Sequence, residues 1–276
     1  MTPFPIILVC GNAGSGKDTV ADKIVSFIPN SIKLAQADEM KRFAAKVFKF
    51  NDQQLWGPSE KREEVDERYD RPRYWDAAVT RFNQESAIWV HELGLEGNAG
   101  AALTAWFFAL PREELTPRHV LQTIGTEFGR TQRYDLWTKK ATNDAEKLLN
   151  GGYSYSREHG VQAGPKLPYD LVVISDGRFR NEVLNVKKLG GGAIKVVPPS
   201  PTSNAGKHQS ESELDNIPYS WFDIVLENNK EHGLAGLTQA MLPVLNNLCP
   251  GTLYLKTFHP STMHVIDPNT KAILDI

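Results

Sequence analysis

Residues Ile6 to Thr19 read Ile-Ile-Leu-Val-Cys-Gly-Asn-Ala-Gly-Ser-Gly-Lys-Asp-Thr, an apolar run followed by closely spaced glycines and a lysine. Apolar residues with β-branched members, as in Ile6 to Cys10, are typical of a buried parallel strand. Glycines allow backbone conformations that a side chain would block, so the amide groups can turn inward around a polyphosphate. Beyond Gly16, apolar residues recur at helical spacing, at Val20, Ile24, Phe27 and Ile28. The stretch therefore predicts a strand, a phosphate-binding loop and a helix whose N-terminus favours an anion.

The loop follows the pattern G-x-x-x-x-G-K-[ST] through Gly11, Gly16 and Lys17, but departs from it at its end. Asp18 occupies the position of the usual hydroxyl, which comes one residue later on Thr19. We expect Lys17 to bridge the β- and γ-phosphates as a catalytic residue, and Asp18 or Thr19 to contact Mg²⁺ through water. The residues predicted to bind ATP are Asn12, Gly14, Ser15, Gly16, Lys17, Asp18 and Thr19. A chance glycine turn is the alternative, but the motif and its strand–loop–helix context agree.

The composition is that of an ordinary α/β protein. The chain has 276 residues, of which 41% are hydrophobic and 23% charged, and its net charge is −2. This balance argues against a general nucleic-acid-binding surface. Cys10 and Cys249 are the two cysteines, so neither a disulfide framework nor a zinc site is indicated. With neither a signal sequence nor a stretch long enough to span a membrane, we expect a cytoplasmic protein without a membrane partner.

Strands alternate with helices along the chain, which predicts a doubly wound parallel sheet with helices on both faces. Five strands are expected, over residues 6–10, 31–37, 171–174, 193–197 and 222–226. We expect one domain over residues 1–276, with a helical insertion over about 51–150 and a tail, 250–276, that has no assigned role. Residues 75–110 are the least legible part of that insertion.

Several connecting segments carry local signals. Thr116-Pro117 is a good helix start, with Thr as N-cap and Pro at the first helical position. Residues 151–168, rich in Gly, Ser and Tyr, are expected to be a flexible loop. Leu234, Leu237, Met241 and Leu245 predict a last helix.

Chemistry-bearing residues follow three of the predicted strands. In a parallel sheet the carboxyl ends of the strands form the ligand-binding edge. The glycine loop follows the first strand, Asp38 the second, and Asp176 and Arg178 the third. Asp176 can reach Mg²⁺ through water or accept a hydrogen bond from a substrate, or it can cap the helix that begins near Phe179. Arg178 can bind a phosphate and is predicted to be catalytic, whereas Arg180 is as well explained by a solvated surface position.

Five stretches together resemble the deoxynucleoside monophosphate kinases of tailed bacteriophages. They are Gly-Lys-Asp-Thr at 16–19, Ala-Asp-Glu-Met-Lys at 37–41, Leu-Gln-Thr-Ile-Gly-Thr-Glu at 121–127 with Trp137 beyond it, Ile-Ser-Asp-Gly-Arg-Phe-Arg-Asn-Glu at 174–182, and His-Gln-Ser-Glu at 208–211. The resemblance implies a P-loop kinase fold with a helical substrate-binding or lid insertion. It also implies Mg²⁺-dependent transfer of a phosphoryl group from ATP to a deoxynucleoside monophosphate. A homodimer is suggested by the family alone, and a phage-encoded enzyme would act in the host cytoplasm.

The resemblance also implies a set of residues that contact the monophosphate substrate. These are Asp38, Lys41, Arg62, Arg118, Gln122, Gly125, Thr126, Trp137 and Asp176. Lys41, Arg62 and Arg118 are suited to its phosphate, and Trp137 to stacking on the base, a contact that tolerates several bases. An ordinary core aromatic explains Trp137 equally well, and a helix-surface amide explains Gln122.

Other functions share parts of the pattern. A different small-molecule P-loop kinase, such as one acting on a coenzyme precursor, would have the loop without the Trp137 region. A nucleotide-dependent switch or assembly ATPase usually has the hydroxyl directly after the loop lysine, where Asp18 stands. An inactive relative would not need Lys17 and Thr19.

The family commonly has Pro in place of Arg180 and a bulkier residue in place of Gly177. The accepted bases, the oligomeric state and the role of Asp18 stay open.

Overall fold

The structure is a computed structural model that describes residues 5–198, 213–228, 265–266 and 273–274. The chain forms two compact units, and each gathers separate stretches of sequence. The first, the sheet unit, takes the residues up to Gln36, Ala141–Ser156 and those from Val161 onward. The second, the helical unit, takes Ala37–Lys140 and Arg157–Gly160. Neither unit is therefore one continuous stretch of chain.

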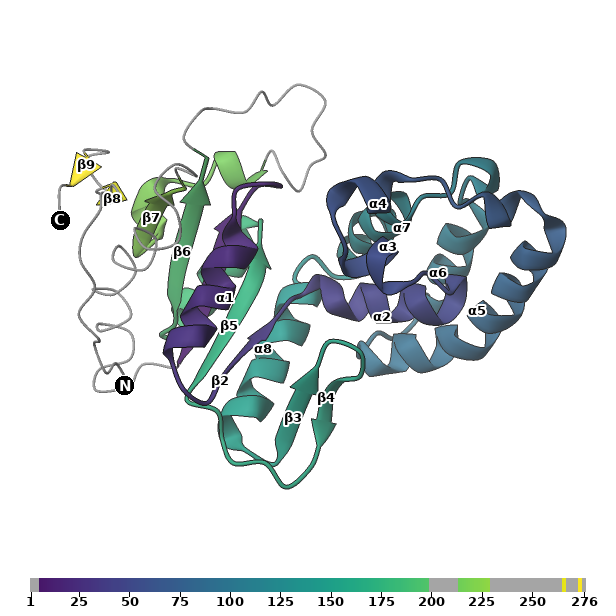
Figure 1. Cartoon of the computed structure of the whole chain (residues 1–276). Helices are drawn as coiled ribbons and strands as arrows, with labels where there is room; N and C mark the ends of the chain where they lie inside the picture. Colours follow the sequence, from purple (N-terminus) through teal and green to yellow (C-terminus); the bar gives the residue numbers. More distant parts are fainter. Residues whose placement is uncertain (1–4, 199–212, 229–264, 267–272, 275–276) are drawn as a thin grey trace. The chain divides into compact units, whose positions relative to one another are not determined.

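Within the described residues, the sheet unit is built on a seven-stranded sheet in the order β2-β5-β1-β6-β7-β8-β9 (Figure 1). The first five strands in this order run parallel. They are β1 (Ile6–Gly11), β2 (Ser31–Leu34), β5 (Leu171–Gly177), β6 (Gly192–Val197) and β7 (Ile224–Glu227). The predicted five-stranded parallel sheet is confirmed: β5, β1, β6 and β7 are buried strands that each lie between two neighbours, and β2 pairs with β5 at the edge.

Two short strands from the C-terminal tail extend this sheet. β8 (Val265–Ile266) pairs antiparallel with β7, and β9 (Ile273–Leu274) pairs antiparallel with β8. The tail, to which the sequence assigned no role, thus contributes strands to one edge of the sheet. Pairing covers the backbone groups of β7 that an edge strand would leave exposed.

Helices cover both faces of the sheet, as predicted. Successive residues of a strand point to opposite faces, and those of β1 divide between two cores. Ile7 and Val9 pack with α1 (Lys17–Phe27). Ile6 and Leu8 lie in the other core, which also takes side chains from α9 (Arg180–Lys188) and from the later part of α8 (Leu136–Asn150). The parallel sheet is therefore a buried middle layer.

The helical unit is built from short and long helices around one core (Figure 1). Its helices are α2 (Ala37–Phe48), α3 (Asp52–Trp56), α4 (Ser59–Glu63), η1 (Glu67–Asp70), α5 (Pro72–Glu92), α6 (Ala99–Phe108), η2 (Arg112–Glu114), α7 (Pro117–Thr123) and the π-helix η3 (Ile124–Arg130). Residues 75–110 thus contain most of α5 and all of α6. The sequence predicted one domain over residues 1–276, with an insertion over about 51–150 and a tail over 250–276. These boundaries stay a prediction.

Aromatic rings dominate the core of the helical unit, and Phe107 is at their centre. Its ring is fully buried and stacks on the rings of Phe82, Trp75 and Phe48, with centroid distances of 4.2, 4.9 and 5.7 Å. These rings come from α2, α5 and α6, so one cluster ties three helices together. Aromatic pairs of this kind contribute about 0.5–1.5 kcal/mol beyond the area that they bury.

Phe107→Ala is expected to lower the free energy of unfolding of the chain's helical unit by about 3–5 kcal/mol, because it leaves a cavity among packed rings. Urea unfolding followed by tryptophan fluorescence measures the change. Phe108→Ala is the matched control, because that neighbouring ring is 57% exposed and its loss should change stability by about 0.5 kcal/mol or less. Equal effects of the two substitutions would contradict the central role of Phe107.

One predicted loop is wrong. Residues 151–168 contain a hairpin of β3 (Tyr153–Ser156) and β4 (Gly160–Ala163), which form a separate two-stranded sheet. Tyr153, Tyr155 and Val161 pack against the sheet-unit core that includes α8. Every second residue of β3 is thus partly buried, an alternation that the many Gly and Ser residues nearby obscure.

Other local predictions have clear outcomes. Thr116 does begin a helix, since its side chain accepts a hydrogen bond from the N–H of His119 at 3.0 Å. That helix continues as the π-helix η3 rather than as a regular α-helix. The predicted last helix, Leu234 to Leu245, and the stretch His208 to Glu211 lie outside the described residues. Among the helices that the structure describes, none combines the length and apolarity needed to span a membrane.

Candidate active site

The loop between β1 and α1 has the backbone of an anion-binding turn. Gly14 and Gly16 adopt φ values of 75° and 88°, a region that residues with a side chain rarely adopt. Gly16 is the N-cap of α1, and as a glycine it has no side chain that could cap this end of the helix. The N–H groups at the start of an α-helix lack partners within it, so they are available to an anion.

Buried polar groups in the loop fit such a ligand. Ser15 is 2% exposed, and its hydroxyl oxygen has no hydrogen-bond partner in the described part of the chain. Lys17, the first residue of α1, is 7% exposed. A buried hydroxyl without a partner costs about 1–3 kcal/mol, and a phosphate oxygen would satisfy it. The donor set of amides, hydroxyl and ammonium is therefore suited to a polyphosphate.

The two candidates for a metal contact lie on the exposed side of α1. The carboxylate of Asp18 is 64% exposed and lies 3.4 Å from Nζ of Lys17, and Thr19 is also exposed. No group of three or more His, Cys, Asp or Glu side chains in the described residues could hold a metal by itself. A Mg²⁺ ion at this loop would take most of its ligands from phosphate oxygens and water, which is its usual preference.

Asp176 lies at the carboxyl end of β5, on the same edge of the sheet as the loop. Its carboxylate accepts a hydrogen bond of 2.9 Å from the N–H of Gln36, which follows β2. The ends of β2 and β5 therefore meet, as the sequence predicted for this edge. The alternative of Asp176 as helix cap is wrong, because α9 begins later and Glu182 accepts the hydrogen bonds of the N–H groups before it.

The two arginines after β5 differ in their surroundings. Arg178 is half-buried, and its N–H donates to the carboxylate of Glu182 at 2.6 Å. Arg180 is exposed and its guanidinium lies 4.4 Å from the ring centroid of Trp221. Stacking of this kind occupies the flat face of the guanidinium, so Arg180 has a packing role on the surface of the sheet unit.

Cys10 lies directly before the loop but is not a reactive group. Its thiol is fully buried in β1, and burial followed by the charge of Glu182 raises its pKa well above the usual value. A thiol with a raised pKa stays protonated and is a poor nucleophile. The carboxyl end of β1 therefore contributes backbone rather than side-chain chemistry.

In the helical unit, the first turn of α2 carries Asp38 and Lys41 around an indole that sequence reasoning missed. The indole N–H of Trp56 donates to the carboxylate of Asp38 at 2.8 Å, and Nζ of Lys41 lies 3.5 Å from the same carboxylate oxygen. The ammonium of Lys41 is 5.6 Å from a ring centroid of Trp56, and the guanidinium of Arg157 is 4.9 Å from it. A tryptophan inside the polar run that follows residue 51 was the one available signal.

Trp56→Phe keeps a ring but removes the donor to Asp38, so we expect the free energy of unfolding to fall by about 1.5–3 kcal/mol, as for hydrogen bonds to charged groups. Urea titration measures the loss. In an Asp38→Ala background the same substitution should have a clearly smaller effect, because the shared hydrogen bond is already absent. The same loss in both backgrounds would show that the indole acts through packing alone.

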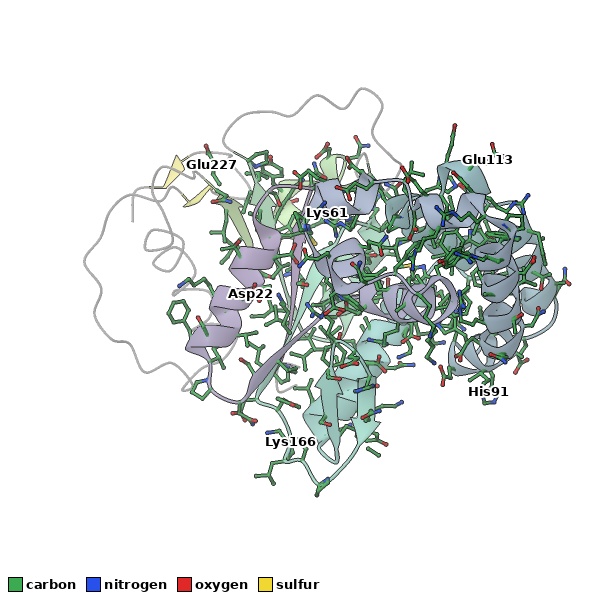
Figure 2. All side chains as sticks on the ribbon, turned by 45° about the vertical axis from the view of Figure 1, so that its right-hand side comes forward. Asp22, Lys61, His91, Glu113, Lys166 and Glu227 are labelled. Carbon is green, nitrogen blue, oxygen red and sulfur yellow. The ribbon has the colours of Figure 1, made fainter. Side chains whose placement is uncertain are left out.

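Arg62 and Arg118 lie on adjacent helices. Arg62, on α4, donates to the hydroxyl of Ser59 at 3.2 Å. Arg118, on α7, forms an ion pair with Glu63 of α4 at 3.0 Å. The Arg118–Glu63 contact joins the two helices, so both guanidinium groups belong to one small α4–α7 substructure. Lys61 and its neighbours on α4 are drawn with their side chains in Figure 2.

The π-helix contains two of the remaining predicted substrate residues, Gly125 and Thr126, whereas Gln122 lies on α7 just before it. Thr126 donates from its hydroxyl to the carbonyl of Gln122 at 2.7 Å, inside the helix. The carbonyl of Gly125 accepts a hydrogen bond of 2.8 Å from the indole N–H of Trp137. π-Helical turns occur frequently at functional sites. Here the wider turn directs one backbone carbonyl toward a side chain of another helix.

Trp137 is a core residue in this structure. It is 4% exposed, and a Cβ atom on Gly129 would lie 2.3 Å from its ring. Of the two explanations for Trp137, packing describes its observed surroundings, because the ring offers a base little surface. Stacking on a substrate base stays a prediction.

The predicted site residues thus fall into two groups, one in each unit. The loop residues, Asp176 and Arg178 belong to the sheet unit. The helical unit holds Asp38, Lys41, Arg62, Arg118, Gln122, Gly125, Thr126 and Trp137. Each group is assembled from several elements of its own unit.

Comparison with known proteins gives one informative similarity. The chain is 28% identical over 230 residues to a protein of Acanthamoeba polyphaga mimivirus named "Putative deoxynucleotide monophosphate kinase". The aligned region covers 82% of this chain and 89% of the viral protein. No protein-family profile matches the chain. The mixed α/β architecture with five parallel strands fits a P-loop kinase fold, and the similarity to a viral protein with a nucleotide kinase name extends along most of both chains.

Proposed function

We propose that the chain is a kinase that transfers a phosphoryl group from ATP to a deoxynucleoside monophosphate. The phosphate loop at the N-terminus of α1, with buried Ser15 and Lys17, carries the donor half of this proposal. The acceptor half is supported by the similarity to the mimivirus protein and by the motifs shared with the phage kinases. A bacteriophage origin rests on the motifs alone.

Phosphoryl transfer needs little covalent chemistry from a protein, because catalysis consists of positioning and charge stabilisation. The N–H groups of the loop would hold the β- and γ-phosphates, and the ammonium of Lys17 would offset the charge that develops on the transferred group. Arg178 would assist from the end of β5. When bound, Mg²⁺ would neutralise phosphate oxygens, and Asp18 or Thr19 would contact it through water.

The acceptor would be bound by the helical-unit group. Lys41, Arg62 and Arg118 supply the positive charge that its phosphate requires, and guanidinium groups can hold phosphate through paired hydrogen bonds. Asp38, Gln122, Thr126 and the backbone of Gly125 supply hydrogen-bonding groups for sugar and base. Asp176 is the predicted acceptor contact in the sheet unit.

The proposal is tested by incubating the purified chain with Mg-ATP and a panel of dGMP, dTMP, dCMP and hydroxymethyl-dCMP, one at a time. ADP should form only when a suitable acceptor is present, together with the matching diphosphate. ADP formation without any acceptor would indicate a switch or assembly ATPase instead. A complete lack of acceptor-dependent ADP across the panel would overturn the proposal, and coenzyme precursors would then be the next acceptors to test.

The same preparation addresses the assembly of the enzyme. The family resemblance suggests a homodimer, and light scattering after size exclusion would give the molar mass directly. A mass near twice that of the chain supports the dimer.

A further inference from the structure

Asn228 contacts the phosphate loop although it is far from the loop in the sequence. It directly follows Glu227, the last residue of β7, which Figure 2 labels. Its N–H donates to the carbonyl of Val197 at the end of β6, at 2.8 Å. Its side-chain amide donates to the carbonyl of Ser15, also at 2.8 Å and across 213 positions of sequence. Asn228 is thus fixed at the carboxyl ends of β6 and β7, and its side chain holds the loop through the backbone carbonyl of Ser15.

This contact fixes the direction of an amide in the loop. The peptide bond between Ser15 and Gly16 is planar and trans, so its C=O and its N–H point in opposite directions. Holding the Ser15 carbonyl toward Asn228 therefore turns the Gly16 N–H away from it. Gly16 also lets Asn228 approach, because a Cβ atom there would lie 2.1 Å from the amide nitrogen of Asn228.

Asp215 holds the beginning of the loop in a similar way. Its carboxylate accepts a hydrogen bond of 2.8 Å from the side-chain amide of Asn12, across 203 positions of sequence. The carbonyl of the preceding residue, Leu214, accepts a hydrogen bond of 3.0 Å from Nζ of Lys195. Lys195 is 3% exposed and belongs to β6, so the segment that carries Asp215 is also tied to the sheet.

We propose that Asn228 and Asp215 are positioning residues that keep the phosphate loop in its anion-binding shape, one at each end of the loop. Both act through the loop, Asn228 on the Ser15 carbonyl and Asp215 on the Asn12 amide. Side chains that hold a site in shape from rigid elements reduce the ordering that binding would otherwise require. The inference rests on the proposed function in that the ligand of the loop is the polyphosphate of a donor nucleotide.

The test compares Asn228→Ala, Asp215→Ala and Asp215→Asn with the full-length wild-type chain. Calorimetry with Mg-ATP and with inorganic tripolyphosphate gives the Kd of each probe. Asn228→Ala and Asp215→Ala should each raise both Kd values by about three- to tenfold, the effect of losing one hydrogen bond. Asp215→Asn should restore the affinity to within about twofold, because its amide oxygen still accepts from Asn12. The KM for the deoxynucleoside monophosphate should stay unchanged.

Two further variants control for folding. Asn143→Ala replaces an exposed asparagine on α8 in the same unit and should leave both Kd values unchanged. Asn228→Leu is the second variant if Asn228→Ala does not fold, since it keeps a similar shape without the donor. Wild-type Kd values in folded Asn228 and Asp215 variants would overturn the inference, as would an equal loss in Asn143→Ala.

The outcome separates this inference from the proposed function. Weakened binding of both probes in the variants, with no acceptor used by the wild type, would support the positioning role and overturn the kinase. An active kinase whose variants bind both probes normally would support the proposed function and overturn the positioning role. A wild-type chain that binds neither probe would overturn both.

Discussion

Replacing Lys17 by alanine is expected to lower kcat for phosphoryl transfer by about 10²–10³-fold, the usual effect of removing one positioned group that stabilises developing charge. Lys17 is the first residue of α1 and is 7% exposed, so its ammonium lies in a site that water only partly screens. Electrostatic interactions are stronger in such surroundings than on an open surface. The rate of ADP formation at saturating ATP and acceptor measures the loss.

Lys23→Ala is the matched control for Lys17→Ala. Lys23 lies on the same helix, where its ammonium is 5.9 Å from the ring centroid of Phe27 rather than in the loop. Its removal should leave kcat within about twofold of the wild type, since surface substitutions have small effects. We expect Lys17→Ala to melt near the wild-type temperature, because removing a largely buried charge also removes the cost of burying it. A near-normal rate in the folded Lys17 variant would show that the loop is not the donor site.

Trp137→Ala is expected to lower the free energy of unfolding by about 3–5 kcal/mol, the usual effect of deleting a buried aromatic ring. The carbonyl of Gly125 would also lose the hydrogen bond that it accepts from the indole. Trp137→Phe should have a smaller effect of about 1–3 kcal/mol, because it keeps one aromatic ring and loses the donor with the smaller ring that carries it. Urea unfolding of both variants, with Tyr134→Ala as an exposed aromatic control, measures these differences.

Kinetics of the Trp137 variants separate packing from contact with a base. In Trp137→Ala we expect the KM for the acceptor to rise much more than the KM for ATP, since the indole donates to Gly125 of the π-helix, which also contains Thr126. If the ring stacks on the base, Trp137→Phe should bind the acceptor nearly as well as the wild type. If the indole instead holds the π-helix in shape, Trp137→Phe should lose acceptor affinity too. Unchanged acceptor KM in folded Trp137→Ala would exclude both roles.

The sheet was predictable because its signal is local. Continuous runs such as Leu171 to Ile174 can hardly avoid burial, and their alternation with helices implies parallel strands. Helix α6 was hard to read because its residues, Ala-Gly-Ala-Ala-Leu-Thr-Ala-Trp-Phe-Phe, are apolar around much of the circumference and leave no clear stripe. Strand β3 was missed because its partly buried residues are two tyrosines separated by serine, a weak apolar pattern.

The same distinction applies to the candidate site. The phosphate loop could be identified because strand, glycines, lysine and helix are consecutive. The contacts of Asn228 and Asp215 with the loop could not be, since each joins residues more than two hundred positions apart. The hydrogen bond between Trp56 and Asp38 likewise depends on how α2 and α3 pack. Sequence patterns identify functional residues that are close together in the chain. The side chains that hold those residues in position are distant in sequence, so they become visible only in the folded structure.

The order of strands in the sheet has a consequence for how the chain folds. β1 and β2 are the first strands to be synthesised, yet they do not pair with each other, because β5 lies between them. Neither can join its neighbour until residues 171–177 have been made, and long-range pairings of this kind form slowly. The aromatic core of the helical unit uses residues 40–137 and can close earlier. We therefore expect a nascent chain to protect the tryptophans of its helical unit from solvent before its phosphate loop acquires the sheet that supports it.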